Sequence, residues 1–588
     1  MDKKTDTPRE ISLFIPRSYL TTEGNKTGSW RFLRPRYEEK TAPCSAACPT
    51  AEDIGRIQML TTQGSFKDAW ETILRENPFP GVCGRVCFHP CEGVCNRGEF
   101  DEAIAIHVTE RFLANTAHRN DFKPEMERRA PKKQNIAVIG AGPGGLSAAY
   151  FLTLLGYRTD VFEAADEPGG VLRWGIPSYR LPLAVLKEEI LRIENLGVRI
   201  QTGKRLAHRD LDTLGKKYDA LFLACGHGRS TALGIPGEEL EGVQDGLSFL
   251  REIREGRVRT FSGQVAVIGG GNAAVDVARS IIRLGGKALI IYRRRRQDMP
   301  AFGEEIGMAL DEGVELRELR APVSIRNAGG DLAVMVRSMK IVGTDTDGRA
   351  HIEPEEGEPE EIKVSHLFTA IGERAEKPWY EPPDGGTDVL RLSHSVMAYK
   401  PGGIFVYGGD LTNGIKSVAH AVASGKEAAL ALDSFFTEGI ESVQPRLAAC
   451  RAGAGPALSM EIYMQGPRSD RNPHVVTYDE INADYFQFDP RVKQPRLLKE
   501  ERARTFGEVS LKISANLAIR ETERCFNCGL CNQCDNCYLF CPDLAVEKDS
   551  EPLGRRIDYE YCKGCGICVV ECPRNALILE EERYEEGH

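Results

Sequence analysis

The pattern of apolar and polar positions changes along the chain. From Lys133 to about residue 436, short β-branched runs such as Asn135–Ile139 alternate with glycine-containing turns and helix-like segments. Strands and helices in alternation are typical of α/β domains with parallel sheets. Residues 1–130 instead contain helix-like segments, for example 66–75, which ends just before the helix breakers of Asn77-Pro-Phe-Pro. The pattern predicts a helical N-terminal domain followed by a larger α/β block.

The rest of the chain divides into two parts. Residues 437–520 mix charge, proline and glycine, which predicts a linker with some structure. Residues 521–579 are dense in cysteine. The acidic residues at the end are expected to be solvated; they are Glu580, Glu581, Glu582, Glu585 and Glu586.

The α/β block begins with a glycine fingerprint. The apolar run 135–139 ends in Gly140-x-Gly142-x-x-Gly145, and a helix-like segment follows. Glycines at these positions let backbone N–H groups and a helix N-terminus approach a pyrophosphate. A second apolar run ends in Glu163, at the spacing where a carboxylate meets a ribose. These residues predict a first dinucleotide site.

A second fingerprint follows in the same block. The run 265–268 leads into Gly269-x-Gly271-x-x-Ala274, and the next apolar run is followed by four arginines, which begin with Arg293 and Arg294. Guanidinium groups match a 2′-phosphate, so arginines in place of a ribose-binding acid favour NADPH over NADH. A solvated basic loop is the alternative interpretation. This site is predicted to bind NADP(H) or NAD(H), with NADP(H) preferred.

Two further segments distinguish the ligands of the two sites. Gly169-Gly170-Val-Leu-Arg-Trp follows the first fingerprint, and Gly403-Ile-Phe-Val-Tyr-Gly-Gly-Asp410 follows the second. This order resembles the two-dinucleotide-domain flavoprotein superfamily, in which an NAD(P)H domain is inserted into a split FAD domain. The resemblance implies FAD at the first site, with Gly170 on the flavin side and Asp410 at the ribityl chain. Cys225 stands where that superfamily usually has threonine.

The positions of the cysteines argue against a thiol-dependent reductase. Pyridine-nucleotide disulfide reductases need a close pair of cysteines beside the flavin ring, but no cysteine lies between Gly226 and Ala449. Neither flavin-side segment carries such a pair. Thiol catalysis at the flavin is not expected, and no catalytic acid, base or nucleophile is predicted.

Composition limits the remaining alternatives. The 588-residue chain contains 18 cysteines, and all except Cys225 and Cys450 fall in two groups near its ends. Residues 1–8 are polar and contain no apolar signal segment, so a cytoplasmic protein without membrane insertion is expected. In a reducing compartment, grouped thiols indicate metals or redox cofactors rather than disulfides. The formal net charge of −10 argues against broad binding to nucleic acid.

The C-terminal cysteines form two successive runs of the type C-x2-C-x2-C-x3-C-P, which is the pattern of bacterial two-cluster ferredoxins. Three cysteines of each run bind one [4Fe–4S] cluster, and the fourth reaches the other cluster. The first predicted ligand set is Cys531, Cys534, Cys537 and Cys572; the second is Cys562, Cys565, Cys568 and Cys541. Zinc is the alternative metal, but structural zinc does not need this doubled pattern. Cys525 and Cys528 form an extra C-x2-C that the pattern does not assign.

The N-terminal cysteines are Cys44, Cys48, Cys83, Cys87, Cys91 and Cys95. Together with Asn77-Pro-Phe-Pro, both glycine fingerprints, Tyr292-Arg-Arg and Met299-Pro-Ala, they resemble the small (β) subunit of NADPH-dependent glutamate synthase and its electron-transfer relatives. The resemblance covers about residues 40–436. It implies an N-terminal domain with two [4Fe–4S] clusters, one of which has a Glu or Gln ligand.

Matched motif by motif, the resemblance places Cys48, Cys87, Cys95 and Glu110 around one cluster. Cys44, Cys91 and Cys83 are left for the other. The C-x2-C that this family carries upstream of Cys44 is missing here, so one or two N-terminal clusters are expected.

The predicted fold is a multidomain α/β protein with four modules. A helical iron–sulfur domain (1–130) is followed by an FAD domain in two pieces (131–240 and 366–436), with an NAD(P)H domain (241–365) inserted between them. A ferredoxin-like α+β domain (521–588) follows the linker (437–520).

Three functions fit this composition of cofactors. FAD can accept two electrons as one hydride and release them singly, which connects nicotinamide to [4Fe–4S] clusters. The chain is expected to be the nicotinamide-handling subunit of a larger metalloenzyme or reductase complex. The alternatives are a self-sufficient NAD(P)H:ferredoxin oxidoreductase and the small subunit of glutamate synthase, which supplies electrons to an amidotransferase.

Overall fold

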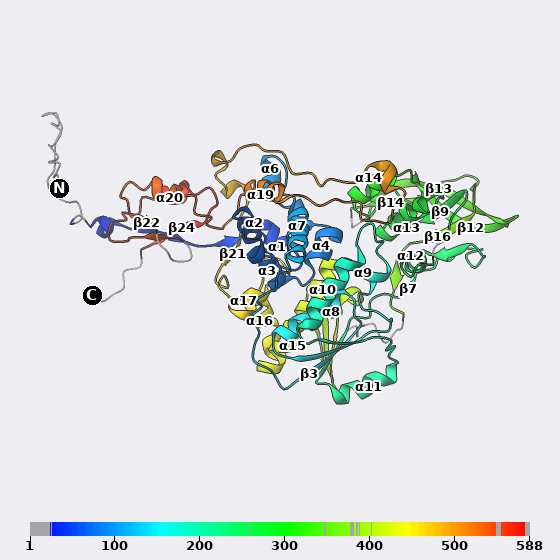
Figure 1. The fold of residues 1–588 in the computed structure, drawn as a ribbon, viewed down its shortest axis with the longest axis horizontal. Helices are drawn as coiled ribbons and strands as arrows, with labels where there is room; N and C mark the ends of the chain where they lie inside the picture. Colours follow the sequence, from blue (N-terminus) through cyan, green and yellow to red (C-terminus); the bar gives the residue numbers. More distant parts are fainter. Residues whose placement is uncertain are drawn as a thin grey trace, which may run out of the picture.

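The computed structural model describes residues 24, 26–257, 259–345, 348–376, 382–383, 386, 388–400, 403–548 and 554–582. Residues 1–8 and the acidic Glu585 and Glu586 lie outside these ranges. Figure 1 shows four modules: a small cysteine-rich module, a helical domain beside it, and two α/β domains. Within the described ranges, no helix combines the length and the apolar character needed to cross a membrane.

The first α/β domain contains a seven-stranded sheet made from two separate stretches of the chain. Its strand order is β18-β19-β20-β6-β3-β4-β5. The strands from β20 to β5 in this order are parallel, whereas β18, β19 and β20 pair antiparallel. The strands are β3 (Asn135–Ile139), β4 (Arg158–Phe162), β5 (Arg199–Gln201), β6 (Ala220–Leu223), β18 (Val389–Arg391), β19 (Val396–Lys400) and β20 (Gly403–Tyr407).

Helices cover this sheet, and two of them approach unusually closely. A Cβ atom on Gly425 of α15 would lie 2.3 Å from the carbonyl oxygen of Gly144 on α8, so only glycine permits this contact. Ile136 and Val138 of β3 are completely buried, as expected for a parallel strand between helical layers. The helices are α8 (Pro143–Leu154), α9 (Val171–Trp174), α10 (Leu183–Asn195), α11 (His208–Lys217) and α15 (Val418–Glu438).

The second α/β domain is formed by the chain between β6 and β18. Its five parallel strands have the order β11-β10-β9-β16-β8. They are β8 (Val243–Asp245), β9 (Gln264–Ile268), β10 (Lys287–Ile291), β11 (Glu315–Arg317) and β16 (His366–Thr369), with helices α12 (Gly246–Arg254), α13 (Asn272–Arg283) and α14 (Gly303–Asp311).

Two smaller sheets accompany the second domain. β12 (Arg320–Ala328), β13 (Asp331–Thr344), β14 (Ala350–Pro354) and β15 (Glu360–Val364) form an antiparallel sheet. β7 (Arg229–Ser230) and β17 (Glu373–Arg374) pair where the chain passes from one domain to the other and back. The second domain is therefore attached to the first by two adjacent extended segments.

The N-terminal domain is helical, and the helix predicted at 66–75 is confirmed as α3 (Phe66–Glu76). Trp70, Ile73, Phe112 and Leu113 form its apolar core, which Ala518 of α19 completes from far along the chain. The helices are α1 (Pro43–Ala47), α2 (Ile54–Thr62), α4 (Pro80–Val86), α5 (Pro90–Gly93), α6 (Arg97–Phe100), α7 (Ile106–Arg119) and α19 (Ala515–Glu523).

The segment expected to be a linker is packed against the rest of the protein. Its strand β21 (Asn472–Val475) pairs with β2 (Lys40–Thr41), and the buried Arg468 donates from Nε to Asp53 over 2.7 Å. Its helices are α16 (Val443–Ala449), α17 (Met460–Met464) and α18 (Lys499–Arg502). Residues 437–520 therefore hold modules together rather than separating them.

The cysteine-rich module combines both ends of the chain, which the sequence boundaries did not foresee. β1 (Leu33–Tyr37) pairs antiparallel with β24 (Leu577–Glu581). Glu580 and Glu582, expected to be solvated, pair with arginines of the N-terminal segment: Arg34 with Glu580 over 2.8 Å, and Arg31 with Glu582. The module also contains α20 (Asn536–Leu539), β22 (Val546–Lys548), β23 (Arg555–Ile557) and α21 (Ile567–Val570).

Candidate functional site

The first glycine fingerprint forms a tight turn between β3 and α8. Gly140 has φ +104°, and a Cβ atom there would lie 2.5 Å from the carbonyl oxygen of Ala224. A Cβ atom on Gly145 would lie only 1.9 Å from the carbonyl oxygen of Gly140. Gly142 is the N-cap of α8 and offers no side-chain hydrogen bond to it. The first amides of α8 are therefore left to bind an anion such as a pyrophosphate.

Glu163 and Gly170 lie beside this turn. Glu163 follows β4, and its carboxylate accepts hydrogen bonds from the amides of Ala141 (2.7 Å) and Ala165 (2.8 Å). Gly170 has φ +53°, and its Cβ would meet the Cα of Gly142 at 2.8 Å. The turn, the carboxylate and the second glycine segment are thus brought together, as an adenosine ribose and pyrophosphate require.

Asp410 lies at the other side of the same sheet edge. It belongs to the short helix η4 (Gly409–Leu411), just before α15. Burial raises the pKa of its carboxyl group, while Lys416 and His227 oppose that shift. Asp410 therefore lies between the carboxyl end of β20 and the N-terminus of α15.

The second fingerprint has the same construction in the second domain. Gly269 has φ +142°, and a Cβ atom there would lie 2.3 Å from the carbonyl oxygen of Ala370. Gly271 is the N-cap of α13, and Ala274 is buried in its first turn. The N-terminus of α13 therefore provides a second anion-binding turn.

The two arginines after β10 differ in their surroundings. Arg293 is exposed. Arg294 donates from Nη2 to Asp345 (2.7 Å) and from Nε to the carbonyl oxygen of Ala350 (2.8 Å). Because Arg294 is held by an ion pair, Arg293 is the better placed of the two to meet a 2′-phosphate.

The N-terminal cysteines divide into two groups, and the division differs from the one implied by the family resemblance. Burial raises the pKa of the Cys91 thiol, and the charges of Cys48 and Cys87, then of Glu92 and Cys44, reinforce the shift, so Cys48 and Cys87 are its principal thiol neighbours. Cys95 instead lies near Cys44. The short spacing explains the exchange, since Cys91 and Cys95 are only four residues apart and either could serve either site.

Glu110 lies beside the first of these groups. Its carboxylate influences the thiols of both Cys83 and Cys87. Burial and the neighbouring Glu52, Glu189 and Glu92 raise the pKa of Glu110, so its anionic form needs a cation. Cys83 packs into the apolar core shared with the first α/β domain. We call Cys48, Cys87, Cys91 and Glu110 the inner site.

Cys44 and Cys95 have two neighbours that the sequence did not assign. Burial raises the pKa of the Cys44 thiol, and the thiols of Cys95, Cys525 and Cys528 reinforce the shift. We call these four cysteines the middle group. The C-x2-C motif was visible in the sequence, but nothing local connected it to Cys44 and Cys95, which lie more than 400 residues away in the sequence.

The C-terminal runs surround two small cavities in the expected combinations. One is lined by Cys531, Cys534, Cys537 and Cys572, and the other by Cys541, Cys562, Cys565 and Cys568. We call them the first and second ferredoxin sites. Cys534 and Cys565 are exposed, so each site has an edge at the surface.

Backbone amides point at several of these sulfurs. In the ferredoxin sites, the amide of Ala545 lies 3.2 Å from Cys541 Sγ, and that of Ala576 lies 3.3 Å from Cys572 Sγ. In the inner site, the amide two residues after Cys87 lies 3.3 Å from Cys87 Sγ. Four thiols around a small cavity, with N–H groups donating to sulfur, match the environment of a [4Fe–4S] cluster.

The inner site is fixed against the first α/β domain. Glu189 of α10 accepts hydrogen bonds from the amides of Gly81 (2.6 Å) and Val82 (3.1 Å) at the start of α4. Phe88, next to Cys87, stacks on His420 of α15 with ring centres 5.6 Å apart. The chain that carries Cys87 therefore contacts the helix whose N-terminus faces the first dinucleotide turn.

Comparison with known families agrees with this arrangement. Residues 134–425 match the family described as pyridine nucleotide-disulphide oxidoreductase. Residues 37–122 match dihydropyrimidine dehydrogenase domain II, 4Fe-4S cluster, and residues 555–578 match the 4Fe-4S binding domain.

Three curated relatives show the extent of the similarity. The β subunit of NADP(+)-dependent formate dehydrogenase from Moorella thermoacetica is 33% identical over 78% of this chain and 70% of its own length. The β subunit of NADPH-Fe(3+) oxidoreductase from Geobacter sulfurreducens is 30% identical over 87% of this chain and 78% of its own. The small chain of glutamate synthase [NADPH] from Halomonas elongata is 30% identical over 66% of this chain and 86% of its own.

Proposed function

Because the chain belongs to the family of FAD-dependent NAD(P)H oxidoreductases that carry [4Fe–4S] clusters, we propose that it is the NADPH-handling subunit of a larger redox complex. It would exchange electrons between NADPH and a partner enzyme. FAD would take up the two electrons of a hydride and pass them on one at a time. Two of the relatives described above are themselves named as β subunits.

The observation that carries this proposal is the continuous series of cysteine sites. The inner site contacts the FAD domain through α4 and Phe88. The ferredoxin sites lie in a separate module, where Cys534 and Cys565 reach the surface. Electrons can therefore leave the protein far from the nicotinamide site, which suits delivery to another protein.

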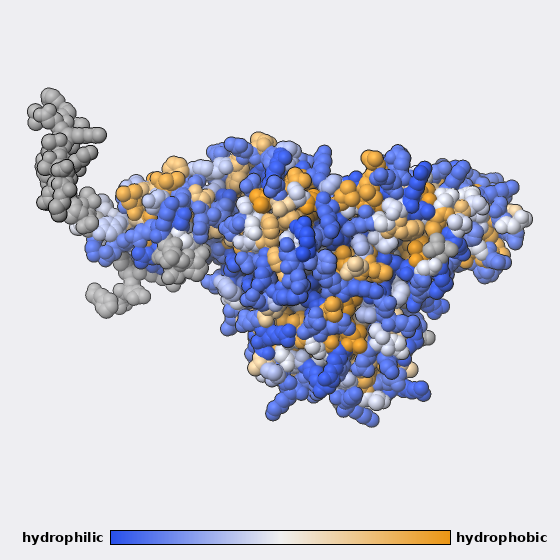
Figure 2. All heavy atoms as spheres, in the orientation of Figure 1, coloured by the Kyte–Doolittle hydropathy of each residue, from blue (hydrophilic) through white to orange (hydrophobic). Residues whose placement is uncertain are grey.

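The surface of the ferredoxin-like module supports docking of a partner. Figure 2 shows hydrophobic residues exposed on this module. The exposed large side chains on and next to α20 and α21 are Tyr538, Leu539, Phe540, Leu544 and Val570. Exposed apolar side chains beside a cofactor mark a surface that another protein covers.

The residues of the chain have binding and orienting roles in this function. The amides at the start of α8 and Glu163 would hold the pyrophosphate and adenosine ribose of FAD, with Asp410 near its ribityl chain. The amides of α13 and the exposed Arg293 would hold NADPH. Cys48, Cys87, Cys91 and Glu110 would hold one cluster, and the ferredoxin sites two more. A cytoplasmic, reducing location is part of this proposal, since cluster thiolates must stay reduced.

Anaerobic purification from the native source, with mass spectrometry of co-eluting chains, tests the proposal. Stoichiometric co-elution with a reductase or metalloenzyme is expected, and the subunit ratio should persist through two unrelated chromatographic steps. Elution as a single chain with rapid NADPH-dependent reduction of ferredoxin would contradict the proposal and support the self-sufficient oxidoreductase.

A further inference from the structure

The C-x2-C motif of Cys525 and Cys528 belongs structurally to the N-terminal domain rather than to the ferredoxin-like module. It directly follows α19, whose Ala518 completes the core of the helical domain. Asn527 between the two cysteines donates from Nδ2 to the carbonyl oxygen of Gly55 over 2.9 Å. Phe526 is buried in the same apolar cluster as Cys44, Cys48 and Cys91.

Several hydrogen bonds fix this segment on the N-terminal domain. The buried Arg97 donates from Nη1 to the carbonyl oxygen of Arg524 over 3.0 Å. The side chain of Arg524 donates to Asp101 (3.0 Å) and to the carbonyl oxygen of Glu102 (2.6 Å). The amide of Lys40 donates to the carbonyl oxygen of Gly529 over 2.9 Å. Cys525 and Cys528 are thus held from both sides at a defined position.

The four thiols of the middle group converge at this position. Cys44 and Cys528 are buried in one apolar cluster, and Cys95 and Cys525 pack against that cluster. The side chain of Asn96, the residue after Cys95, donates to Cys528 Sγ over 3.4 Å. The raised pKa of the Cys44 thiol agrees with this proximity, since Cys95, Cys525 and Cys528 reinforce the effect of burial. Cys44 and Cys528 are 8% and 9% exposed, so solvent does not solvate their sulfurs. Four cysteines from three separate segments, two of them buried and two half-buried, meet without forming a disulfide.

The groups around these sulfurs are donors and cations. The amide of Asn527 lies 3.4 Å from Cys525 Sγ, and the side-chain amide of Asn96 lies 3.4 Å from Cys528 Sγ. The guanidinium groups of Arg574 and Arg97 act on Cys525. These are the partners that a cluster with four thiolate ligands requires, because its net charge is negative and its sulfurs accept hydrogen bonds.

We propose that Cys44, Cys95, Cys525 and Cys528 bind a [4Fe–4S] cluster whose ligands come from opposite ends of the chain. The C-terminal C-x2-C takes the place of the motif that is absent upstream of Cys44. Each of the pairs Cys44/Cys48 and Cys91/Cys95, spaced by four residues, then gives one ligand to the inner site and one to the middle site.

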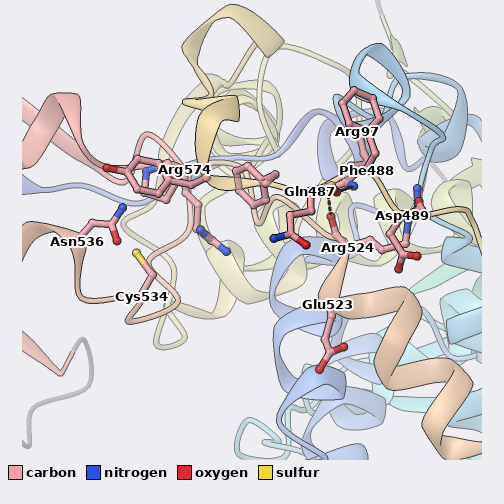
Figure 3. Close-up of a pocket in the computed structure, with 12 residues that line it drawn as sticks. Arg97, Gln487, Phe488, Asp489, Glu523, Arg524, Cys534, Asn536 and Arg574 are labelled. Atoms are coloured by element: carbon pink, nitrogen blue, oxygen red, sulfur yellow. Dashed lines mark hydrogen bonds between the residues drawn. The ribbon is translucent and has the colours of Figure 1, made fainter.

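This cluster connects the inner site to the ferredoxin sites, so the inference deepens the proposed electron path. Cys528 and Cys531 are three residues apart, which limits the distance between their Cα atoms to about 11 Å. Arg574 interacts with Cys525 on one side and with Cys531, Cys534 and Cys572 on the other. Figure 3 shows Arg574 near Cys534 at one end of a pocket whose other end holds Arg97 and Arg524.

The iron content of the native protein tests the inference without any variant and without an assay of activity. With the inner site, the middle site and two ferredoxin sites filled, anaerobically purified protein should contain about sixteen iron and sixteen sulfide per chain, at four each per cluster. Mössbauer spectroscopy should assign all of this iron to [4Fe–4S] clusters. Full-length protein that reproducibly holds about twelve iron per FAD, with zinc or a Cys525–Cys528 disulfide found instead, overturns the proposal.

Substitutions show which cysteines share the cluster. The pair Cys525→Ser/Cys528→Ser should lose about four iron, Cys44→Ser the same four, and the triple variant no more than four. Adding Cys572→Ser should remove a further cluster. The matched control Cys450→Ser, at a buried cysteine outside every site, should keep all the iron.

Iron losses that add up to about eight in the triple variant would show that Cys44 and the C-x2-C serve different clusters, and would overturn the inference. If a variant does not fold, the iron count and Mössbauer spectrum of the native chain decide alone. Loss of NADPH oxidation in the native protein would affect the proposed function but not this cluster count, so the two failures are distinguishable.

Discussion

We propose that single side chains beside the two glycine turns determine which dinucleotide each turn accepts. The carboxylate of Glu163 accepts a hydrogen bond from the amide of Ala141 and so lies beside the first turn, where we propose that it meets a ribose. In the second domain the corresponding region contains arginines. Of these, Arg293 is exposed, whereas Arg294 is engaged by Asp345.

Arg293→Ala is expected to raise KM for NADPH about tenfold or more and to leave KM for NADH nearly unchanged. A charge-assisted hydrogen bond to a phosphate contributes about 1.5–3 kcal/mol, and NADH lacks that phosphate. Steady-state kinetics with both nucleotides measures the split. Arg296→Ala, at an exposed neighbouring arginine, is the control; equal losses with both nucleotides would exclude 2′-phosphate recognition by Arg293.

Gly145→Ala should prevent FAD binding. The added Cβ would lie 1.9 Å from the carbonyl oxygen of Gly140, so the turn that presents the amides of α8 cannot form. The FAD content of the purified variant, measured by absorbance after denaturation, should fall to near zero. Gly307→Ala adds a Cβ atom with nothing within 4 Å and should retain full FAD. A Gly145→Ala variant with full FAD would contradict the assignment of this turn.

Glu373 should make stability depend on pH near neutrality. Burial, followed by repulsion from Asp245 and Asp410, raises its pKa to about 7. A folded-state pKa above the unfolded one means that its favourable contribution is complete below about pH 4.5 and is lost as the pH rises through about 7. The thermal unfolding midpoint of Glu373→Gln, relative to that of the wild type, should therefore be higher at pH 8 than at pH 5.5. Glu361→Gln, at an exposed position, should show no such change.

At the scale of elements, α4 and α10 form the joint between the inner site and the FAD domain. Glu189 of α10 accepts two hydrogen bonds from the N-terminal amides of α4. Lys426 of α15 forms a buried ion pair with Glu76 at the end of α3. The first contact joins α4 to α10, and the second joins α3 to α15. Both therefore hold helices of the N-terminal domain against helices of the first α/β domain.

Glu189→Ala should loosen this joint and slow electron transfer between FAD and the clusters. Two buried amides would lose their acceptor, at about 1–3 kcal/mol of stability each at most. Stopped-flow absorbance after mixing with NADPH should show flavin reduction at the wild-type rate but slower cluster reduction. Glu194→Ala, at an exposed position of the same helix, is the control. Unchanged cluster reduction in Glu189→Ala would show that this joint does not govern the transfer.

Local pattern was sufficient to predict the glycine turns and α3, because their signals lie within a few adjacent residues. The same locality limited the prediction of pairings over long distances. β1 pairs with β24 across more than 500 residues, and its five residues carry no pattern that names a partner. The division of the N-terminal cysteines between two clusters remains a prediction, since Cys91 and Cys95 are only four residues apart and spacing alone leaves their partners open.

At the scale of the whole molecule, the ends of the chain are brought together twice. β1 forms a two-stranded sheet with β24 of the ferredoxin-like module, and the C-x2-C at Cys525 lies against the N-terminal domain. The segment 437–520, expected to be a linker, makes this return and is fixed by the buried Arg468–Asp53 pair. We propose that this arrangement makes the cysteine sites one series from the FAD domain to the surface.

The redox response of the clusters to the nicotinamide couple tests this series most directly. Oxidised protein would be treated anaerobically with NADPH, and dithionite-reduced, desalted protein with NADP+, while flavin absorbance and the EPR signals of the clusters are followed. Clusters with potentials above that of NADPH should be reduced in the first experiment, and those below it should be reoxidised in the second, with NADPH formed. A flavin that responds in both experiments while every cluster keeps its initial redox state would contradict the account.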